Sequence, residues 1–224
     1  MKTVWVHAHV GSNPTLCATA GCFGSLLFLF INIQILYTYH IIGDMMNKRI
    51  FKLEAIGFIF TSVLGTLMHF FYEWSGNNTF VALFCPVNES PYEHLKLLFF
   101  PFLIWTFVEN IKLSNNKFNI FTSKLIGILL GMYVTLSVFY VFEGATGKTV
   151  DAVNIASFFI GVLIAYIISY IITVSSKGKG IINGISFALL IIIGISFIFF
   201  TFYPVKIPLF MDPQNLTYGI TKQF

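Results

Sequence analysis

The residues best suited to chemistry gather between positions 69 and 94 of the sequence. His69 and Glu73 are four residues apart, a spacing that places two side chains on one face of a helix. Imidazole and carboxylate groups together bind divalent metals such as zinc or iron, and a His/Glu pair can also act as general acid and base without a metal. The candidate metal ligands are His69, Glu73, Glu89, Glu93, His94 and Asp151, and the candidate catalytic residues are His69, Glu73, Glu93 and His94.

These residues also have purely structural interpretations. Residues 90–93 (SPYE) match a capping box, in which Ser90 caps a helix, Pro91 takes the first helical position and Glu93 bonds back to the cap. Asp151 can cap another helix, and the remaining acidic residues can be solvated helix ends. The capping pattern predicts a helix that begins near residues 90–91.

The elements that must position these residues are membrane-spanning helices. The chain has 224 residues, of which 57% are hydrophobic and only 10% charged, and its mean hydropathy is +0.83. Soluble domains carry about 25% charged residues, so the composition excludes a water-soluble or disordered protein. Because the basic residues are scattered singly, we expect no nucleic-acid partner.

Five apolar segments are long enough to cross about 30 Å of hydrocarbon. They are continuous rather than alternating, which favours helices over a β-barrel. We therefore expect an all-α fold, a bundle of five transmembrane helices in the cell membrane. Pro101 should kink its helix or leave a carbonyl unbonded. The segments are 52–72, 95–112, 119–142, 151–174 and 180–203.

Charged residues predict the orientation of the bundle, because Lys and Arg are enriched in cytoplasmic loops. The end assigned to the cytoplasm holds Lys48, Arg49, Lys52, Lys112, Lys117, Lys124, Lys177 and Lys179, and the outer end holds Lys96, Lys148, Lys206 and Lys222. The acidic residues at the outer end are Glu73, Glu89, Glu93, Glu143, Asp151 and Asp212. We expect the N-terminus inside, the C-terminus outside, and the polar site and the tail after Tyr203 at the outer face.

Residues 1–44 differ from the rest of the chain. Residues 11–14 (GSNP) match a translated transfer-RNA T-arm, and residues 42–46 (IGDMM) can be encoded by a ribosome-binding sequence followed by a start codon. We expect these residues to be a mis-annotated extension and 45–224 to form a single membrane domain that begins at Met45 or Met46. The alternative is that residues 23–39 are a signal peptide or an additional transmembrane helix.

Several short motifs carry a family resemblance. They are residues 69–76 (HFFYEWSG), 86–90 (PVNES), 93–97 (EHLKL), 208–213 (PLFMDP) and 218–220 (YGI). In these motifs the chain resembles an uncharacterised family of small prokaryotic integral membrane proteins, over about residues 46–220. The resemblance implies a multi-pass membrane protein and a start near Met45 or Met46, but no activity.

Three classes of function remain open. The first is a membrane-embedded enzyme, dependent on a divalent metal or on acid/base chemistry, that acts on a lipid or another small molecule. The second is a small transporter or ion-binding protein, and the third is a structural or assembly protein without catalysis. Charged residues deep within several helices would favour the transporter class. Because Glu54 and Glu109 lie near the inner helix ends, we expect a nearly charge-free interior and a one-sided site.

Overall fold

A computed structural model of the chain describes residues 48–113, 118–147, 150–175 and 180–220, and the expected extension 1–44 lies outside the described residues. The described part is helical and contains no β-strand, only an isolated bridge between Met211 and Tyr218. Its helices are α2 (Lys48–Trp74), α3 (Thr79–Ala82), α4 (Pro91–Lys112), α5 (Ile120–Thr146), α6 (Asp151–Ser175) and α7 (Ile181–Phe202), followed by the 3-10 turn η1 (Pro208–Phe210).

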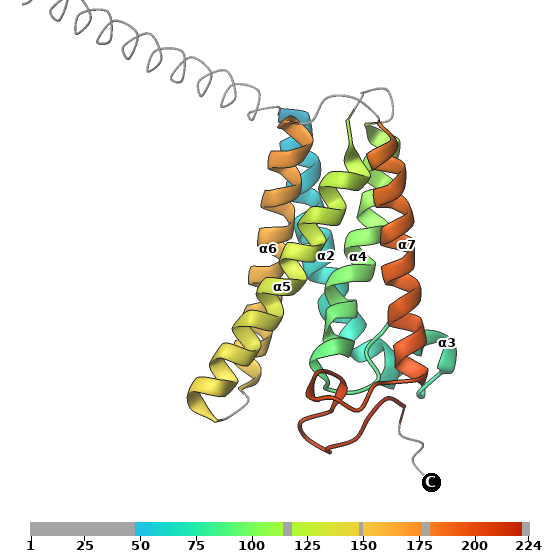
Figure 1. Ribbon diagram of the computed structural model, residues 1–224, viewed down its shortest axis with the longest axis vertical. Helices are drawn as coiled ribbons and strands as arrows, with labels where there is room; N and C mark the ends of the chain where they lie inside the picture. Colours follow the sequence, from blue (N-terminus) through green and yellow to red (C-terminus); the bar gives the residue numbers. More distant parts are fainter. Residues whose placement is uncertain (1–47, 114–117, 148–149, 176–179, 221–224) are drawn as a thin grey trace, which may run out of the picture. The chain divides into compact units, whose positions relative to one another are not determined.

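All helices except the short α3 are long and apolar enough to cross a membrane, which makes five candidate spans among the described residues. The prediction of an all-α, multi-pass membrane bundle is therefore confirmed. Because the five long helices alternate in direction, residues 75–90, α3 and the tail 203–220 all gather at one end of the bundle (Figure 1). We call this end the site end, since it holds the residues between positions 69 and 94.

The start of α4 is the expected helix cap. Ser90 has an extended backbone (φ −69°, ψ 145°), its hydroxyl accepts the backbone N–H of Glu93, and Pro91 opens the helix. Only half of the capping box forms, because the Glu93 carboxylate accepts the backbone N–H of Val87 at 3.2 Å instead of bonding back to the cap. This cap holds the segment before α4 in a fixed conformation.

Helices α5 and α6 pack closely along small residues. A Cβ atom added to Gly127 would lie 2.5 Å from the carbonyl oxygen of Ala165, and one added to Gly131 would lie 2.7 Å from that of Gly161. The two glycines of α5 are four residues apart, and so are Gly161 and Ala165 of α6. Such spacing of small residues lets membrane helices approach backbone to backbone, so α5 and α6 form a tight pair (Figure 1).

A second close approach joins α2 to α4. Pro101 has no N–H, so the carbonyl of Leu97, four residues earlier, has no partner within its own helix. A Cβ atom at Gly65 of α2 would lie only 2.5 Å from that carbonyl oxygen. Glycine at position 65 therefore lets α2 pack directly on the carbonyl that Pro101 leaves free.

The interior of the bundle carries charges. Lys96 and Lys124 are fully buried. Lys124 Nζ of α5 is 2.7 Å from Glu54 Oε2 of α2. Burial of these charges was not predicted, although all of them lie near helix ends, as Glu54 and Glu109 were expected to. Both lysines were assigned to the membrane surface when the orientation was predicted, because a sequence gives no sign that a lysine near a helix end has a buried partner.

Candidate functional site

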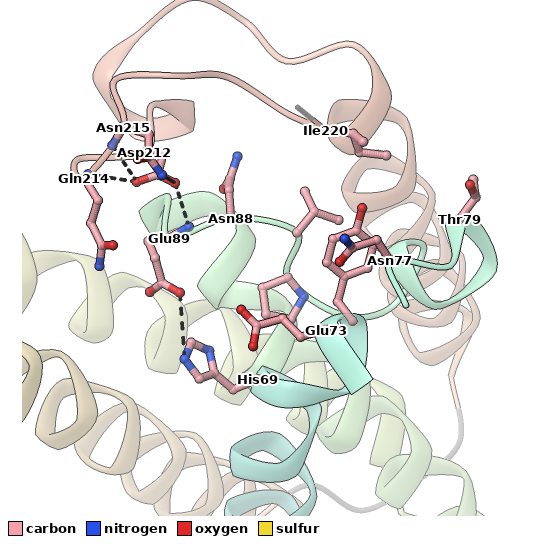
Figure 2. A pocket seen from close by; sticks show the side chains of 13 residues that line it. His69, Glu73, Asn77, Thr79, Asn88, Glu89, Asp212, Gln214, Asn215 and Ile220 are labelled. Atoms are coloured by element: carbon pink, nitrogen blue, oxygen red, sulfur yellow. Dashed lines mark hydrogen bonds and ion pairs between the residues drawn. The ribbon is translucent and has the colours of Figure 1, made fainter. Parts of the chain in front are cut away.

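Three of the predicted ligand residues converge at the site end. His69 lies near the end of α2, Glu89 precedes α4, and His94 is in the first turn of α4. One ligand atom from each residue lies within 4.8 Å of the others. Glu89 stands between the two rings: its Oε2 is 3.3 Å from His94 Nε2, and its Oε1 is 3.8 Å from His69 Nε2. Figure 2 shows the contact between Glu89 and His69. We call these three residues the His–Glu–His cluster.

The hydrogen bond of His94 determines which of its nitrogens faces Glu89. Its Nδ1 is 3.0 Å from the carbonyl oxygen of Ser90. Since a carbonyl only accepts, Nδ1 carries a proton and donates it. In the neutral ring, Nε2 then presents its lone pair to the Glu89 carboxylate. A favourable contact between these two acceptors at 3.3 Å therefore needs a proton on one of them or a metal ion between them.

The electrostatics of Glu89 agree with this arrangement. The hydrogen bond to His94 lowers the pKa of the Glu89 carboxyl below its ordinary value, burial opposes that shift, and the charges of the two imidazole rings reinforce it. Glu89 is therefore an anion wherever His94 is protonated or metal-bound.

His69 is positioned differently from His94. Its ring packs edge-on against Phe70 at a centroid distance of 5.1 Å and lies 5.3 Å from the His94 ring. Its Nδ1 is buried and has no hydrogen-bond partner among the described residues. Packing, rather than a hydrogen bond to the protein, thus orients the His69 ring toward Glu89.

The cluster lies where two cavities meet. A cavity of about 720 Å³, rich in polar side chains, opens at the site end (Figure 2). A second cavity of about 380 Å³ is lined mainly by apolar side chains of α2, α4 and α6. His69, Glu89 and Gln214 line both cavities. A molecule in either cavity can therefore contact the cluster.

The C-terminal tail fixes the position of Glu89. The backbone N–H of Glu89 donates to Asp212 Oδ2 at 3.4 Å, and the Asn88 side chain donates to the carbonyl of Gly219 at 3.1 Å. Asp212 is itself buried and accepts the backbone N–H of Gln214 at 2.8 Å. Asp212 was not predicted as part of the site. The signals available were its assignment to the outer end with the other acidic residues and the turn-forming sequence around Pro213.

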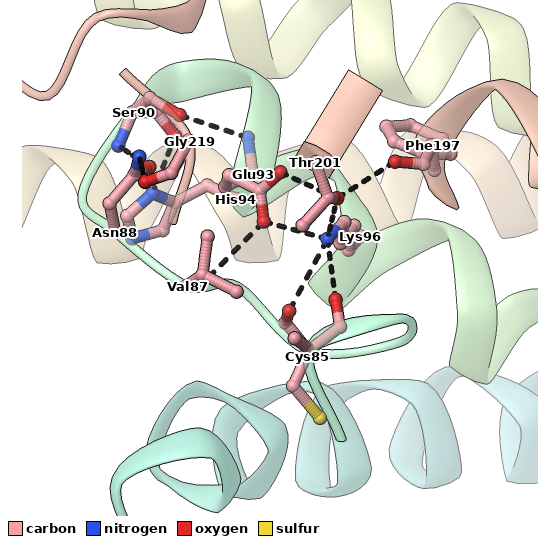
Figure 3. A network of polar contacts seen from close by, with 11 residues as sticks. Cys85, Val87, Asn88, Ser90, Glu93, His94, Lys96, Phe197, Thr201 and Gly219 are labelled. Atoms are coloured by element: carbon pink, nitrogen blue, oxygen red, sulfur yellow. Dashed lines mark hydrogen bonds and ion pairs between the residues drawn. The ribbon is translucent and has the colours of Figure 1, made fainter. Parts of the chain in front are cut away.

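Glu93 lies outside the cluster and belongs to a separate buried network (Figure 3). Lys96 Nζ donates to Glu93 Oε2 at 2.7 Å, to the carbonyl of Ala82 at 3.0 Å and to the hydroxyl of Thr201. The Thr201 hydroxyl also lies 3.0 Å from Glu93 Oε1. Every N–H of the ammonium group is therefore used, and the network joins α4 to α7, to the end of α3 and, through the carbonyl of Cys85, to the loop after α3. Lys96 was not predicted here, although it follows Glu93 by one helical turn.

The two remaining candidates do not join the cluster. Glu73 is exposed and lines the polar cavity. Asp151 is the first residue of α6, and its side chain is outside the described part of the structure. Asn154, one turn further along α6, lines the apolar cavity. Of the six predicted ligands, the structure thus brings together His69, Glu89 and His94.

Comparison with known proteins gives a family but no activity. A family model described as "Family of unknown function (DUF6512)" matches residues 41–220. No curated protein matches the chain. No solved structure matches it either.

Proposed function

The chain belongs to this family of unknown function, and we propose that it is a membrane enzyme with a divalent metal ion bound by His69, Glu89 and His94. The convergence of these three ligand atoms within 4.8 Å supports the proposal. Two imidazoles and one carboxylate suit zinc or ferrous iron. The membrane is the cell membrane, and the substrate is a lipid or another small molecule.

The surroundings of the ligands favour a metal. His94 donates its other ring N–H to a backbone carbonyl, as metal-bound histidines commonly do. Glu89 is held by its backbone contact with Asp212. Three protein ligands leave a coordination position for water or substrate, which distinguishes catalytic zinc sites from structural ones. The polar cavity beside the cluster gives that position access to solvent.

The chemistry that such an ion supplies is activation of water or of a carbonyl or phosphoryl oxygen. Glu73 lines the same cavity and is the candidate for proton transfer. Glu93 positions the start of α4 through Lys96. The substrate reaches the cluster from the polar cavity or from the apolar one.

A second candidate is acid/base chemistry without a metal. The observation that favours it is the 3.3 Å contact between His94 Nε2 and Glu89 Oε2, a distance within the range of a hydrogen bond. In that case His94 carries both ring protons and donates one to the carboxylate.

Metal analysis separates the two candidates. The full chain would be purified in detergent, dialysed against zinc, ferrous iron or manganese, and analysed by mass spectrometry for bound metal. We expect near-stoichiometric metal in the wild type and in Glu73→Gln, and its loss in His69→Ala, Glu89→Gln and His94→Ala with helix content unchanged. Absence of metal from the folded wild type under all three conditions would exclude the metal centre and leave the acid/base pair.

A further inference from the structure

The end of the bundle opposite the site end contains a second cluster of ionisable side chains. Glu54 of α2, Glu109 of α4 and Lys124 of α5 meet there, and none of them is more than 4% exposed. Lys124 Nζ is 2.7 Å from Glu54 Oε2 and 2.5 Å from Glu109 Oε2. We call these residues the Glu–Lys–Glu triad. The proposed metal centre makes no use of them.

The charges of the triad do not balance if all three groups are ionised. Two carboxylates and one ammonium group leave an uncompensated negative charge inside the bundle. Such a charge is costly at this burial, and more so within a membrane. Neutralisation therefore requires another positive group or a proton.

Among the described residues that contact the triad, none supplies a second cation. The groups found against it are neutral: Ser169 and Tyr166 of α6, and Phe102 of α4. Thr61 of α2 bonds only to the Tyr166 hydroxyl, at 2.7 Å. Helix α7 contains no Asp, Glu, Lys, Arg or His. The basic residues at this end of α2 and α4 are exposed: Lys48, Arg49, Lys52 and Lys112.

The two carboxyl groups differ in their hydrogen bonds. Glu54 accepts from Lys124 at one oxygen and from the Ser169 hydroxyl, at 2.8 Å, at the other. Glu109 Oε2 lies against the same ammonium group, whereas Glu109 Oε1 has no hydrogen-bond or ion-pair partner among the described residues. Hydrogen bonds stabilise the ionised form of a carboxyl. Glu109 Oε1 is thus the carboxyl oxygen of the triad that has no polar partner among the described residues.

We propose that the triad is a membrane-buried proton-binding site, in which the two carboxyl groups of Glu54 and Glu109 share a single proton and Lys124 neutralises the remaining negative charge. The proton completes the charge balance by converting one of the two carboxylates to a carboxylic acid. A metal cation in its place would lie against the Lys124 ammonium group and be repelled. Loss of the proton restores the unbalanced charge, which favours states in which water enters between α4 and α5. The pH thereby acts on the packing of these helices.

Infrared spectroscopy of the full chain in lipid vesicles tests this proposal, because a protonated carboxylic acid has a carbonyl stretch distinct from that of a carboxylate. We expect the wild type at neutral pH to show this band, and Glu109→Gln to lack it. Glu54→Gln should lack it too, because Glu109 then ionises and pairs with Lys124. Glu143→Gln, at the far end of α5, is the matched control and should retain the band.

Lys124→Met gives a sharper result. Without the ammonium group both carboxyls must be neutral, so the band should double in intensity. A wild type without the band, or a band that survives both Glu54→Gln and Glu109→Gln, would overturn the proposal. A band that disappears when sodium replaces potassium in the buffer would overturn it as well, since the site would then bind a metal cation.

The pH dependence of unfolding provides an independent measurement. A proton held in the folded state stabilises it, and this contribution is lost as the pH rises through the titration of the folded protein. The wild type should therefore lose thermal stability in mild alkali, and Glu109→Gln, whose amide resembles the neutral acid, should lose less. Equal losses in the two proteins would contradict the proposal.

Discussion

Glu93 and His94 are adjacent in the chain, yet their side chains belong to different networks. Glu93 Oε2 is 2.7 Å from Lys96 Nζ in the interior, whereas His94 Nε2 is 3.3 Å from Glu89 Oε2 at the junction of the two cavities. Successive helical residues are turned by about 100° around the axis, so a single turn of α4 places one side chain in each network. The buried ion pair thus holds in place the turn that presents His94.

Removing one partner of this ion pair should destabilise the folded protein more than removing both partners. Lys96→Met leaves Glu93 buried without its cation, and we expect a loss of about 3–5 kcal/mol in the free energy of unfolding. The double variant Glu93→Gln/Lys96→Met removes both charges and should recover part of that loss. Denaturant unfolding in detergent measures both, with Lys206→Met, at an exposed residue, as the control. A double variant less stable than Lys96→Met would contradict the prediction.

Acid should weaken the site through Glu89. Its folded-state pKa is lowered, chiefly by the hydrogen bond with His94. The resulting stability is present above the ordinary carboxyl pKa and is lost as the pH falls through the lowered one. The unfolding temperature of the wild type should therefore fall in acid more steeply than that of Glu89→Gln. If the unfolding temperatures of the two proteins fell equally with pH, Glu89 would not contribute to the acid dependence of stability.

Two glycines should not tolerate even a methyl group. Gly65→Ala would place Cβ against the Leu97 carbonyl, and Gly161→Ala would place it against Thr135 Oγ1 and the Gly131 carbonyl. We expect each to lower the free energy of unfolding by about 1–3 kcal/mol through overpacking. Gly184→Ala is the control, because no atom lies within 4 Å of its added Cβ and alanine is a better helix former. Unfolding midpoints in detergent would reveal the difference. Equal stability of all three variants would refute the close helix contacts.

Cys85 should be chemically inert in the folded protein. It is buried, and burial raises the pKa of its thiol to about 11. The thiolate is the reactive form, so its population at neutral pH falls roughly 100-fold relative to an ordinary thiol. In a Cys17→Ser/Cys22→Ser background, maleimide labelling should be slow until the protein is unfolded. Rapid labelling of the folded chain would place Cys85 in contact with solvent.

The sequence predicted the helices well because their signals are local. A continuous apolar run is sufficient to identify a membrane helix, and the cap at Ser90 requires only residues 90–93. The family resemblance, carried by short motifs, is confirmed by the family match over residues 41–220.

The site was predicted only in part because side-chain partners are not local. His69, Glu89 and His94 were predicted as ligands together with Glu73 and Glu93. Nothing in the sequence distinguished the residues that converge from those that do not. That Glu93 faces Lys96 depends on the fold of the loop after α3 and on Thr201, 108 positions later. For the same reason the contact of Lys124 with Glu54, 70 positions earlier, could not be foreseen.

The Glu–Lys–Glu triad also bears on how the protein is made. Chains are synthesised from the N-terminus, so Glu54 of α2 and Glu109 of α4 precede Lys124 of α5 during biosynthesis. Each of these two carboxyl groups is therefore synthesised before the lysine that neutralises it. Carboxyl groups avoid the cost of entering a bilayer as anions by entering in the protonated form. Two neutral acids can thus become part of an ion-paired triad only once α5 has been made.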